Sequence, residues 1–439
     1  MDGLLTKIGI TGKLRRNFGV IVMLALSGSV IQGLPSFRFD YYDAYLKTYH
    51  LTNTQMGLFG TILGVLGIVS YLFGGIVADG LSIRKIISFS LIVTGIGGLL
   101  HLLPLSFYGL LGIYALWGIS TTFAFAPACI KAVRFMTDEN SQGKGFGYYE
   151  GAGSVGSAIA AIVAVWLFRV GTYRMSNEVL AMKYVIIFYS FANILMGILT
   201  YISMSGEEET MKGSMVSLRG FMEVIRHPAV WIICAISFCN HTFCLSMSYF
   251  IPYTTDILGA AVAFGATLGV LRKVGSIGGN IVGGYLVDFF GTKRMMFAAF
   301  LVTFICQVAV VLLPAQASSL TVVVVLFVII MVFFHMSNSM AWTMMSEGAV
   351  PPEYSGTAAG LICIAGSIPG TFVSAFAGRL IDSHPGAKGF HYFFYFLIAM
   401  MAVGMILSLV WMFYVKKVEL RKCDMDSDVM QDLKCKTCK

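Results

Sequence analysis

Two adjacent cations, Arg272 and Lys273, lie in the middle of an otherwise apolar run from Ala260 to Leu286. A charge at the centre of a bilayer costs about 2.5 to 3.5 kcal/mol even on the milder insertion scales, so such a residue has either a function or a partner. A guanidinium binds a carboxylate, sulfonate or phosphate through two parallel hydrogen bonds. We therefore predict that Arg272 binds an anionic ligand and that Lys273 assists it, provided that the cavity is broad enough to reach both. The alternative is a structural ion pair with Glu150 or Asp256.

Two charged residues of the N-terminal half are candidates to act with this pair. Arg38 lies where the first apolar stretch ends and would complement Arg272 from the opposite half. Alternatively, it snorkels to water or pairs with Asp40 or Asp43. Glu150 lies within an apolar stretch and would carry a proton if it is buried. Because it is near the end of that stretch, the alternative is a hydrated surface residue.

Membrane-spanning helices must position these residues. The chain has 57% hydrophobic residues, 12% charged residues and a mean hydropathy of +0.81, whereas a soluble domain is usually about 25% charged. Apolar stretches long enough to cross the hydrocarbon core recur along nearly the whole sequence. We predict an all-α membrane protein with twelve transmembrane helices, at 17–36, 54–77, 85–104, 107–130, 145–168, 184–204, 229–251, 262–287, 294–313, 320–345, 356–380 and 391–414.

Basic residues set the expected orientation, because Lys and Arg in short loops resist translocation. Most of them fall in the terminal segments and in alternate loops, including Arg15 and Arg16 before the first span and Lys416 and Lys417 after the last. Both termini are therefore predicted to be cytoplasmic, in a plasma (bacterial inner) membrane. This rule and contact with anionic lipid explain the net charge of +8, and the sequence has no nucleic-acid motif. No removable signal peptide is expected, because no small-residue cleavage site precedes the first span.

A repeated motif indicates two homologous halves. Gly75, Asp79, Ser82, Arg84 and Lys85 recur 209 positions later as Gly284, Asp288, Gly291, Lys293 and Arg294. Gly143, Gly147 and Gly153 likewise recur 213 positions later as Gly356, Gly360 and Gly366. Glycines at four-residue spacing let helices approach closely in lipid, so we predict packing seams on helices 5 and 11 and on the Gly275, Gly279 and Gly283 face of helix 8.

The expected organisation is an N-terminal six-helix bundle over 1–204, a cytoplasmic central loop over 205–228, a C-terminal six-helix bundle over 229–414 and a cytoplasmic tail over 415–439. Within the central loop, 218–225 has helical spacing and is predicted to lie along the membrane surface. Pro228 then begins the seventh helix.

At both copies of G-x-x-x-D-x-x-[GS]-x-[RK]-[RK] the sequence resembles the major facilitator superfamily, whose loops between helices 2 and 3 and between helices 8 and 9 have this form. The resemblance covers nearly the whole chain and implies two bundles related by a pseudo-twofold axis. The first copy departs from the family pattern at Gly80, Ser82 and Ile83. The stretch from Arg38 to Asp43, which leads to Thr52, Asn53 and Gln55, is also similar to a branch that carries organic anions.

The resemblance implies a gate at these loops. A carboxylate at the inner end of helix 2 or helix 8 can meet a helix N-terminus and basic side chains when the inner side is closed. The alternative is that the acids only fix the turn and the topology. In the first half, the candidate partners are Lys131 and Arg134. The full predicted gating set is Asp79, Arg84, Lys85, Arg134, Asp288, Lys293 and Arg294.

The resemblance also implies that helices 1, 4, 7 and 10 line the cavity. The polar and aromatic residues of these helices fit that use, because such side chains usually line small-molecule sites. Each of them has an ordinary alternative as a satisfied core residue. They are Gln32; Trp117 and Thr121; Asn240, His241, Tyr249 and Tyr253; and His335, Asn338 and Trp342.

Other chemistries are not expected. Most of the nine cysteines fall inside predicted spans, where free Cys behaves as a small apolar residue. Cys435 and Cys438, with Cys423 upstream, are too few for a zinc site and indicate a disordered or lipidated tail. The G-x-G-x-x-G pattern that starts at Gly151 falls inside an apolar helix, so it does not indicate nucleotide binding. We predict no enzyme activity, no cofactor and no metal.

These observations predict a monomeric secondary transporter that moves a small organic anion, such as a carboxylate, a sulfonate or a phosphorylated sugar, by rocker-switch alternating access. No ATP-binding motif is present, so an ion or a counter-substrate must drive transport, by symport or by anion exchange. The first alternative is a proton-coupled carrier of a neutral sugar or nucleoside, in which Glu150 or His241 takes the proton. The second is a non-transporting sensor with the same fold.

Overall fold

The computed structural model describes residues 12–80, 82–137, 142–175, 177–204, 218–351 and 355–437, and the regular elements in these ranges are helical. The N-terminal half contains α2 (Gly12–Ile31), α3 (Gly33–Asp40), α4 (Tyr42–Tyr49), α5 (Asn53–Gly80), α6 (Ile83–Leu100), α7 (Phe107–Trp117), η1 (Gly118–Phe125), α8 (Ala126–Phe135), α9 (Gln142–Met175) and α10 (Glu178–Ser203). The short α11 (Leu218–Arg226) follows.

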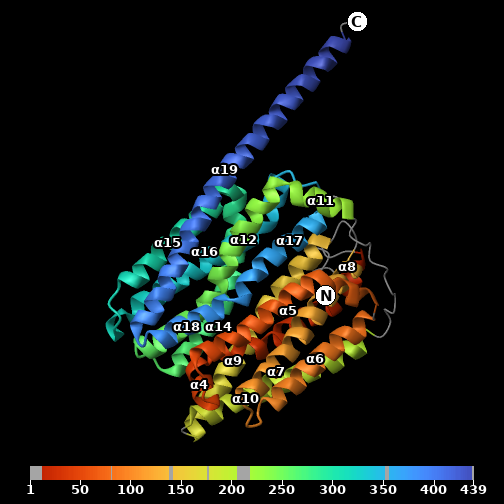
Figure 1. The fold of residues 1–439 in the computed structure, drawn as a ribbon. Helices are drawn as coiled ribbons and strands as arrows, with labels where there is room; N and C mark the ends of the chain where they lie inside the picture. Colours follow the sequence, from red (N-terminus) through yellow and green to blue (C-terminus); the bar gives the residue numbers. More distant parts are fainter. Residues whose placement is uncertain are drawn as a thin grey trace.

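The C-terminal half contains α12 (Pro228–Ser246), η3 (Met247–Tyr249), α13 (Phe250–Pro252), η4 (Tyr253–Ile257), α14 (Val262–Phe290), α15 (Thr292–Leu312), η5 (Ala317–Ser319), α16 (Leu320–Glu347), α17 (Ser355–Ser367), η7 (Ile368–Thr371), α18 (Val373–Ser383) and α19 (Ala387–Thr437). Figure 1 shows the two halves side by side, with the N-terminal half in red to yellow and the C-terminal half in green to blue.

Each of the twelve predicted spans coincides with one helical rod. Ten rods in the described ranges are long and apolar enough to cross a membrane. The other two are the α7, η1 and α8 rod over 107–135 and α14 over 262–290, which match the predicted spans 107–130 and 262–287. The all-α fold class is therefore confirmed. The helix predicted at 218–225 is present as α11, and Pro228 is the first residue of α12. The position of α11 along the membrane surface stays a prediction.

Several rods are broken where a proline falls within the span. Proline removes one backbone donor, and its ring clashes with the carbonyl four residues earlier. Pro35 stands four residues after Ile31, where α2 ends, so the first rod stops short of its predicted end at 36 and continues as α3. Pro127 follows the π-helical η1, Pro252 follows the 3₁₀ turn η3, and Pro369 lies in the 3₁₀ turn η7.

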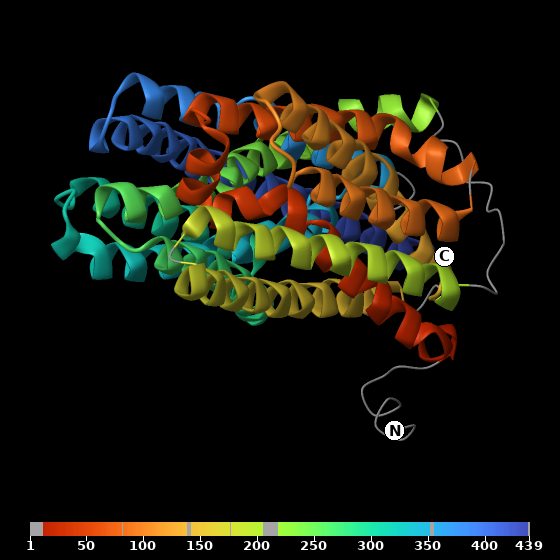
Figure 2. The ribbon, with the colours of Figure 1, turned by 90° about the horizontal axis from the view of Figure 1, so that it is seen from below.

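The helices define two ends of the bundle. At the tail end, α5 and α14 finish and α19 leaves the bundle; at the loop end, α5 begins at Asn53 and α18 finishes at Ser383. α2 begins and α19 finishes toward the same side (Figure 2). α19 continues as a helix to Thr437, well past its predicted end at 414 (Figure 1). Cys435 lies in this extension, whereas Cys438 lies outside the described residues.

At most of the glycines predicted to form packing seams, a neighbouring helix lies within van der Waals contact. A Cβ on Gly279 or Gly283 would crowd α16, and a Cβ on Gly156 would crowd Ser29 of α2. Gly147 and Gly360, in contrast, face open space, so the prediction does not hold there.

The seam that joins the two halves at the loop end was not predicted. It consists of Gly57, Gly60 and Gly64 of α5 against Gly370 of η7 and Ser374 of α18. A side chain on Gly57 or Gly64 would collide with the opposite backbone. The two helices therefore approach as closely as their backbones permit, which is the arrangement that small residues allow in lipid. We call this contact the loop-end seam.

We predict that Gly64→Val prevents the loop-end seam from closing. Overpacking of a tight contact typically costs about 1 to 3 kcal/mol, which would shift the population toward a state open at the loop end by about 5- to 150-fold. Spin labels at Lys47 and Lys388, both exposed at the loop end, would report this opening as a longer distance. Gly112→Val is the matched control, because nothing lies within 4 Å of its added Cβ. An unchanged distance distribution in Gly64→Val would contradict this account of the seam.

Candidate functional site

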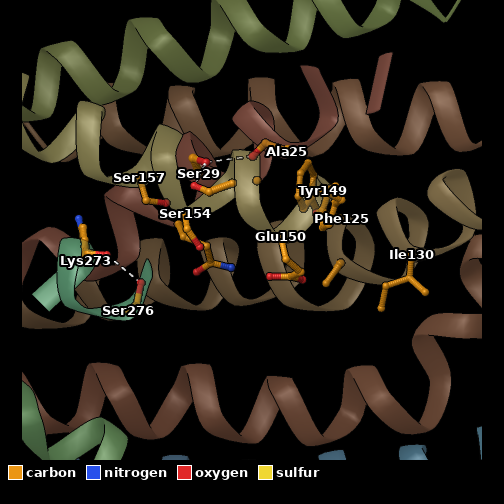
Figure 3. A pocket seen from close by; sticks show the side chains of 14 residues that line it. Ala25, Ser29, Phe125, Ile130, Tyr149, Glu150, Ser154, Ser157, Lys273 and Ser276 are labelled. Atoms are coloured by element: carbon orange, nitrogen blue, oxygen red, sulfur yellow. Dashed lines mark hydrogen bonds between the residues drawn. The ribbon is translucent and has the colours of Figure 1, made fainter. Parts of the chain in front are cut away.

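A cavity of about 400 Å³ lies between the two halves. Its walls come from α2, from the η1 and α8 region, from α9 and from α14. Figure 3 shows Lys273 and Ser276 entering from α14 on one side, while Ser154, Ser157 and Glu150 come from α9. The cavity extends from the middle of α14 toward the tail end, where Glu150 and Ile130 line it.

Gln32, Lys273 and Glu150 are the predicted site residues that line this cavity. The hydroxyl-rich part of the wall was not predicted. The Ser29 hydroxyl lies 2.9 Å from the Ala25 carbonyl and 2.6 Å from the Gly153 carbonyl, and donation of its single proton to Gly153 ties α2 to α9. Ser154 and Ser157 make no hydrogen bond within the described part of the chain, which leaves two hydroxyls of α9 available to a ligand.

The two cations of α14 meet a carboxylate of the opposite half. Arg272 Nη2 lies 3.5 Å from Asp40 Oδ1, and Lys273 Nζ lies 3.5 Å from Asp40 Oδ2. Arg272 Nη1 also donates to Ser248 Oγ at 2.5 Å. The ion pair that was considered as an alternative to binding therefore exists, with Asp40 as the acid in place of Glu150 or Asp256. Lys273 lines the cavity, and Arg272 is turned toward Ser248 of η3.

Arg38 is not part of the cavity wall. Its side chain is buried, with 2% of the residue exposed, and its guanidinium lies over the rings of Phe39 (4.5 Å), Tyr114 (4.8 Å) and Phe59 (5.9 Å). Nη1 donates to the Met56 carbonyl at 3.4 Å. No ion pair between Arg38 and an acid of the described ranges is present, so neither Asp40 nor Asp43 neutralises it.

The predicted residues of helix 4 belong to an aromatic cluster inside the N-terminal half. Trp117 stacks on His101 with ring centroids 5.4 Å apart and donates to the Thr94 carbonyl at 3.1 Å. Thr121 is buried and donates to the Trp117 carbonyl. The cluster centres on His101, whose Nε2 lies 2.8 Å from Tyr45 Oη. His101 was missed, because a single His at the end of an apolar stretch carries no sequence signal of its own.

Most of the predicted residues of helices 7 and 10 form hydrogen bonds or ring contacts with residues of the C-terminal half. Asn240 Oδ1 accepts a hydrogen bond from Ser337 at 2.8 Å, and Tyr249 Oη donates to the Ser374 carbonyl at 2.8 Å. His241 Nδ1 lies 3.1 Å from the Ser237 carbonyl. Tyr253 is buried against Phe390 and Phe394. His335 packs beside Phe334 and Gly279. The side chains of Asn338 and Trp342 lie outside the described part.

The predicted gating residues fall into three groups. The side chains of Asp79, Asp288 and Arg134 lie outside what the structure describes, and Lys85 and Arg294 are exposed. Arg84 lies over the Tyr201 ring at 3.8 Å and donates to the Tyr201 carbonyl. Lys293 forms an ion pair with Glu419 at 2.8 Å. Both contacts are made within a single half.

A second contact between the halves, also missed from the sequence, closes the loop end. The Asp382 carboxylate at the end of α18 accepts hydrogen bonds from the backbone and side chain of Asn53 (3.1 and 2.8 Å) and of Thr54 (2.7 and 2.6 Å). These are the first residues of α5, so a carboxylate of one half neutralises the exposed donors and the positive dipole end of a helix in the other. The loop end is thus held shut while the cavity extends toward the tail end.

Known proteins are similar to this chain both in sequence and in fold. The model of the Major Facilitator Superfamily matches residues 18–374. The chain belongs to this superfamily. It is 25% identical over 410 residues to the inner membrane protein YqcE of Escherichia coli strain K12, covering 91% of this chain and 95% of that protein. It is 23% identical over 421 residues to YihN, another inner membrane protein of that strain, covering 94% and 98%.

Solved structures of this superfamily share the fold. A bacterial homolog of the human lysosomal transporter Spinster, inward-facing and occupied, matches with a TM-score of 0.73 and 17% identity over 91% of this chain and 97% of that one. A mutant of the nucleoside transporter NupG matches with a TM-score of 0.68 and 12% identity, covering 90% and 98%. The chain is therefore a multi-pass membrane transporter of the major facilitator fold, not an enzyme.

We predict that Asp382→Asn weakens closure of the loop end. The variant keeps the shape but loses the charge that faces the α5 N-terminus, and an exposed contact of this kind is worth about 1 kcal/mol, or about a fivefold change in population. The spin-label distance between Lys47 and Lys388 should lengthen in a larger fraction of molecules. Glu178→Gln is the control, since Glu178 is an acid at the same end, on α10. Equal behaviour of the two variants would refute a specific role for Asp382.

Proposed function

We propose that the protein is a secondary transporter of a small organic anion, bound in the cavity between the halves by the Lys273 ammonium. The observation that carries the proposal is the position of Lys273 in the cavity wall, next to uncommitted hydroxyls and between two bundles. A cavity of about 400 Å³ falls within the range of known small-molecule sites and has the size of a metabolite rather than a peptide.

The charge balance around α14 supports an anion. Arg272 and Lys273 contribute two positive charges, and Asp40 offsets one of them, so the cluster keeps one surplus positive charge next to the cavity. The wall beside it supplies hydroxyls and the Gln32 amide, which suit a polyhydroxylated carboxylate, sulfonate or phosphorylated sugar. The sequence stretch from Arg38 to Asp43, similar to an organic-anion branch, is consistent with this class.

The mechanism that fits is rocker-switch alternating access, in which the bundles 1–204 and 229–414 pivot around the cavity. The loop-end seam and Asp382 close one side. The distribution of basic residues supports a cytoplasmic tail end, and in that orientation the structure would correspond to the inward-facing state. Asp79 and Asp288, with Arg134 and the basic residues of the two motifs, would close the tail end in the opposite state.

Coupling requires an ion or a counter-substrate, because the chain carries no ATP-binding motif. An empty cavity with surplus positive charge resists reorientation, which favours exchange of one anion for another. Glu150 lines the same cavity and would serve as the proton carrier in a symport mode. The second candidate function, proton-coupled transport of a neutral sugar or nucleoside, is supported by Glu150 and the serines of the wall; the likeness to NupG shows only the shared fold.

We predict that Lys273→Gln lowers the affinity for the transported anion by about ten- to a hundredfold, because a hydrogen bond to a charged group is worth about 1.5 to 3 kcal/mol. Thermal shift and counterflow in proteoliposomes would measure it with gluconate, glucose 6-phosphate, isethionate, glucose and uridine. Lys183→Gln is the control, since Lys183 is exposed on α10. Transport of glucose or uridine with unchanged affinity in Lys273→Gln would overturn the anion proposal in favour of the neutral solute.

We predict that Glu150→Gln abolishes accumulation driven by a pH gradient and leaves exchange at equal pH intact, if the coupling ion is a proton. Glutamine keeps the size of the side chain but carries no titratable proton. The measurement is uptake of the same solutes into proteoliposomes with and without an imposed pH gradient. Accumulation that persists in Glu150→Gln would exclude Glu150 as the carrier and leave anion exchange as the mode.

A further inference from the structure

We propose that Asp40 is a built-in competitor of the substrate. Its carboxylate pairs with the Lys273 ammonium when the cavity is empty. When the substrate binds, its anionic group replaces the Asp40 carboxylate as the partner of that ammonium, and one ion pair between the halves is lost. The inference rests on the proposed function, since it requires an anion at Lys273. It assigns to Asp40 both a part in determining affinity and a part in preventing movement of the empty carrier.

Lys273 faces the two competitors at the same time. Its side chain lines the cavity, and its Nζ lies 3.5 Å from Asp40 Oδ2. Charge-assisted hydrogen bonds between an ammonium and a carboxylate are usually about 2.7 to 2.9 Å long, so the pair with Asp40 is longer than optimal. An anion that enters from the tail end therefore meets an ammonium that is only partly satisfied.

Asp40 does not become isolated when Lys273 leaves it. Its carboxylate is largely buried, with 9% of the side chain exposed, and Oδ1 has no hydrogen-bond partner among the described residues. A buried carboxylate without a cation is costly. Arg272 remains 3.5 Å away and is held in place by Ser248, so it keeps Asp40 neutralised throughout. Because Arg272 stays paired with Asp40, Lys273 can exchange Asp40 for another anion at a small cost in free energy.

The contact also joins the two halves. Asp40 is the last residue of α3 in the N-terminal half, and both of its cations lie on α14 of the C-terminal half. Gly269, one turn before Lys273, leaves the room that Asp40 occupies, because any Cβ there would collide with its carboxylate. The side chain is therefore inserted against the α14 backbone. Loss of the Lys273 contact weakens one of the attachments that keep the loop end closed.

The consequence is a difference between the empty and the loaded carrier. When the cavity is empty, both cations hold Asp40 and the loop end stays closed. When the substrate pairs with Lys273, this attachment is lost while the contacts of Arg272, Asp382 and the loop-end seam remain, and reorientation becomes easier. A carrier of this kind exchanges solutes quickly and releases them slowly into a medium without solute.

The test compares Asp40→Asn with wild type in proteoliposomes, with gluconate, glucose 6-phosphate and isethionate as probes. Removing the competitor should raise the affinity for the probe that wild type binds by about tenfold, within the usual range of coupling between sites. Gly269→Ala is the second variant, because it displaces Asp40 without changing any charge and should raise the affinity as well. Efflux into probe-free medium should rise toward the exchange rate in Gly269→Ala, whereas Asp40→Asn leaves a second surplus positive charge in the empty cavity, which opposes this rise. Monodisperse elution of each purified variant checks folding.

Asp382→Asn is the matched control, because it removes a carboxylate from the same interface far from Lys273 in sequence and contact. It should speed efflux without raising affinity. If Asp40→Asn and Gly269→Ala leave affinity unchanged while Lys273→Gln abolishes binding, competition by Asp40 is wrong and the anion site stands. If Lys273→Gln also leaves binding unchanged, or wild type binds none of the three probes, the proposed function fails together with this inference.

Discussion

The structure depends on how two cations in the middle of a membrane helix are neutralised. Arg272 and Lys273 lie on α14, surrounded by apolar residues, and the acid that neutralises them belongs to the other half of the molecule. A pair made within one helix would stabilise that helix in every conformation. A pair made between the halves stabilises only the conformation in which the halves meet. The need to neutralise these cations in the bilayer therefore makes the conformation depend on which anion pairs with them.

Breaks in the helices lie beside the residues that form the charge cluster. Non-helical or loosely wound segments are tolerated in a membrane only where protein or a water-filled cavity surrounds them. Pro35 stops α2 at Ile31 and starts α3, which brings Asp40 against α14. Pro252 follows the η3 turn that contains Ser248, the residue that holds Arg272. The prolines therefore do more than bend helices, because they place both the carboxylate and the hydroxyl that complete the charge cluster.

The sequence predicted the twelve rods, because each is a long apolar stretch bounded by polar loops. Of the residues that it proposed for binding or proton transfer, Gln32, Lys273 and Glu150 line the cavity. It did not predict that Trp117 would pack on His101, because the rotation of a helix about its axis depends on packing against its neighbours and not on composition. The loop-end seam was missed for a similar reason: Gly57, Gly60 and Gly64 form a pattern that becomes an interface only with Gly370 and Ser374 opposite.

The spacing of Arg38 and Asp40 explains why the carboxylate is available to the other half. Two residues apart on a helix, side chains point about 200° apart and do not face each other. Arg38 therefore turns into its own half, where the rings of Phe39, Phe59 and Tyr114 surround it. Asp40 turns outward and meets α14. An ion pair between the two would have left α14 with two uncompensated cations, so the two-residue spacing is what makes Asp40 a link between the halves.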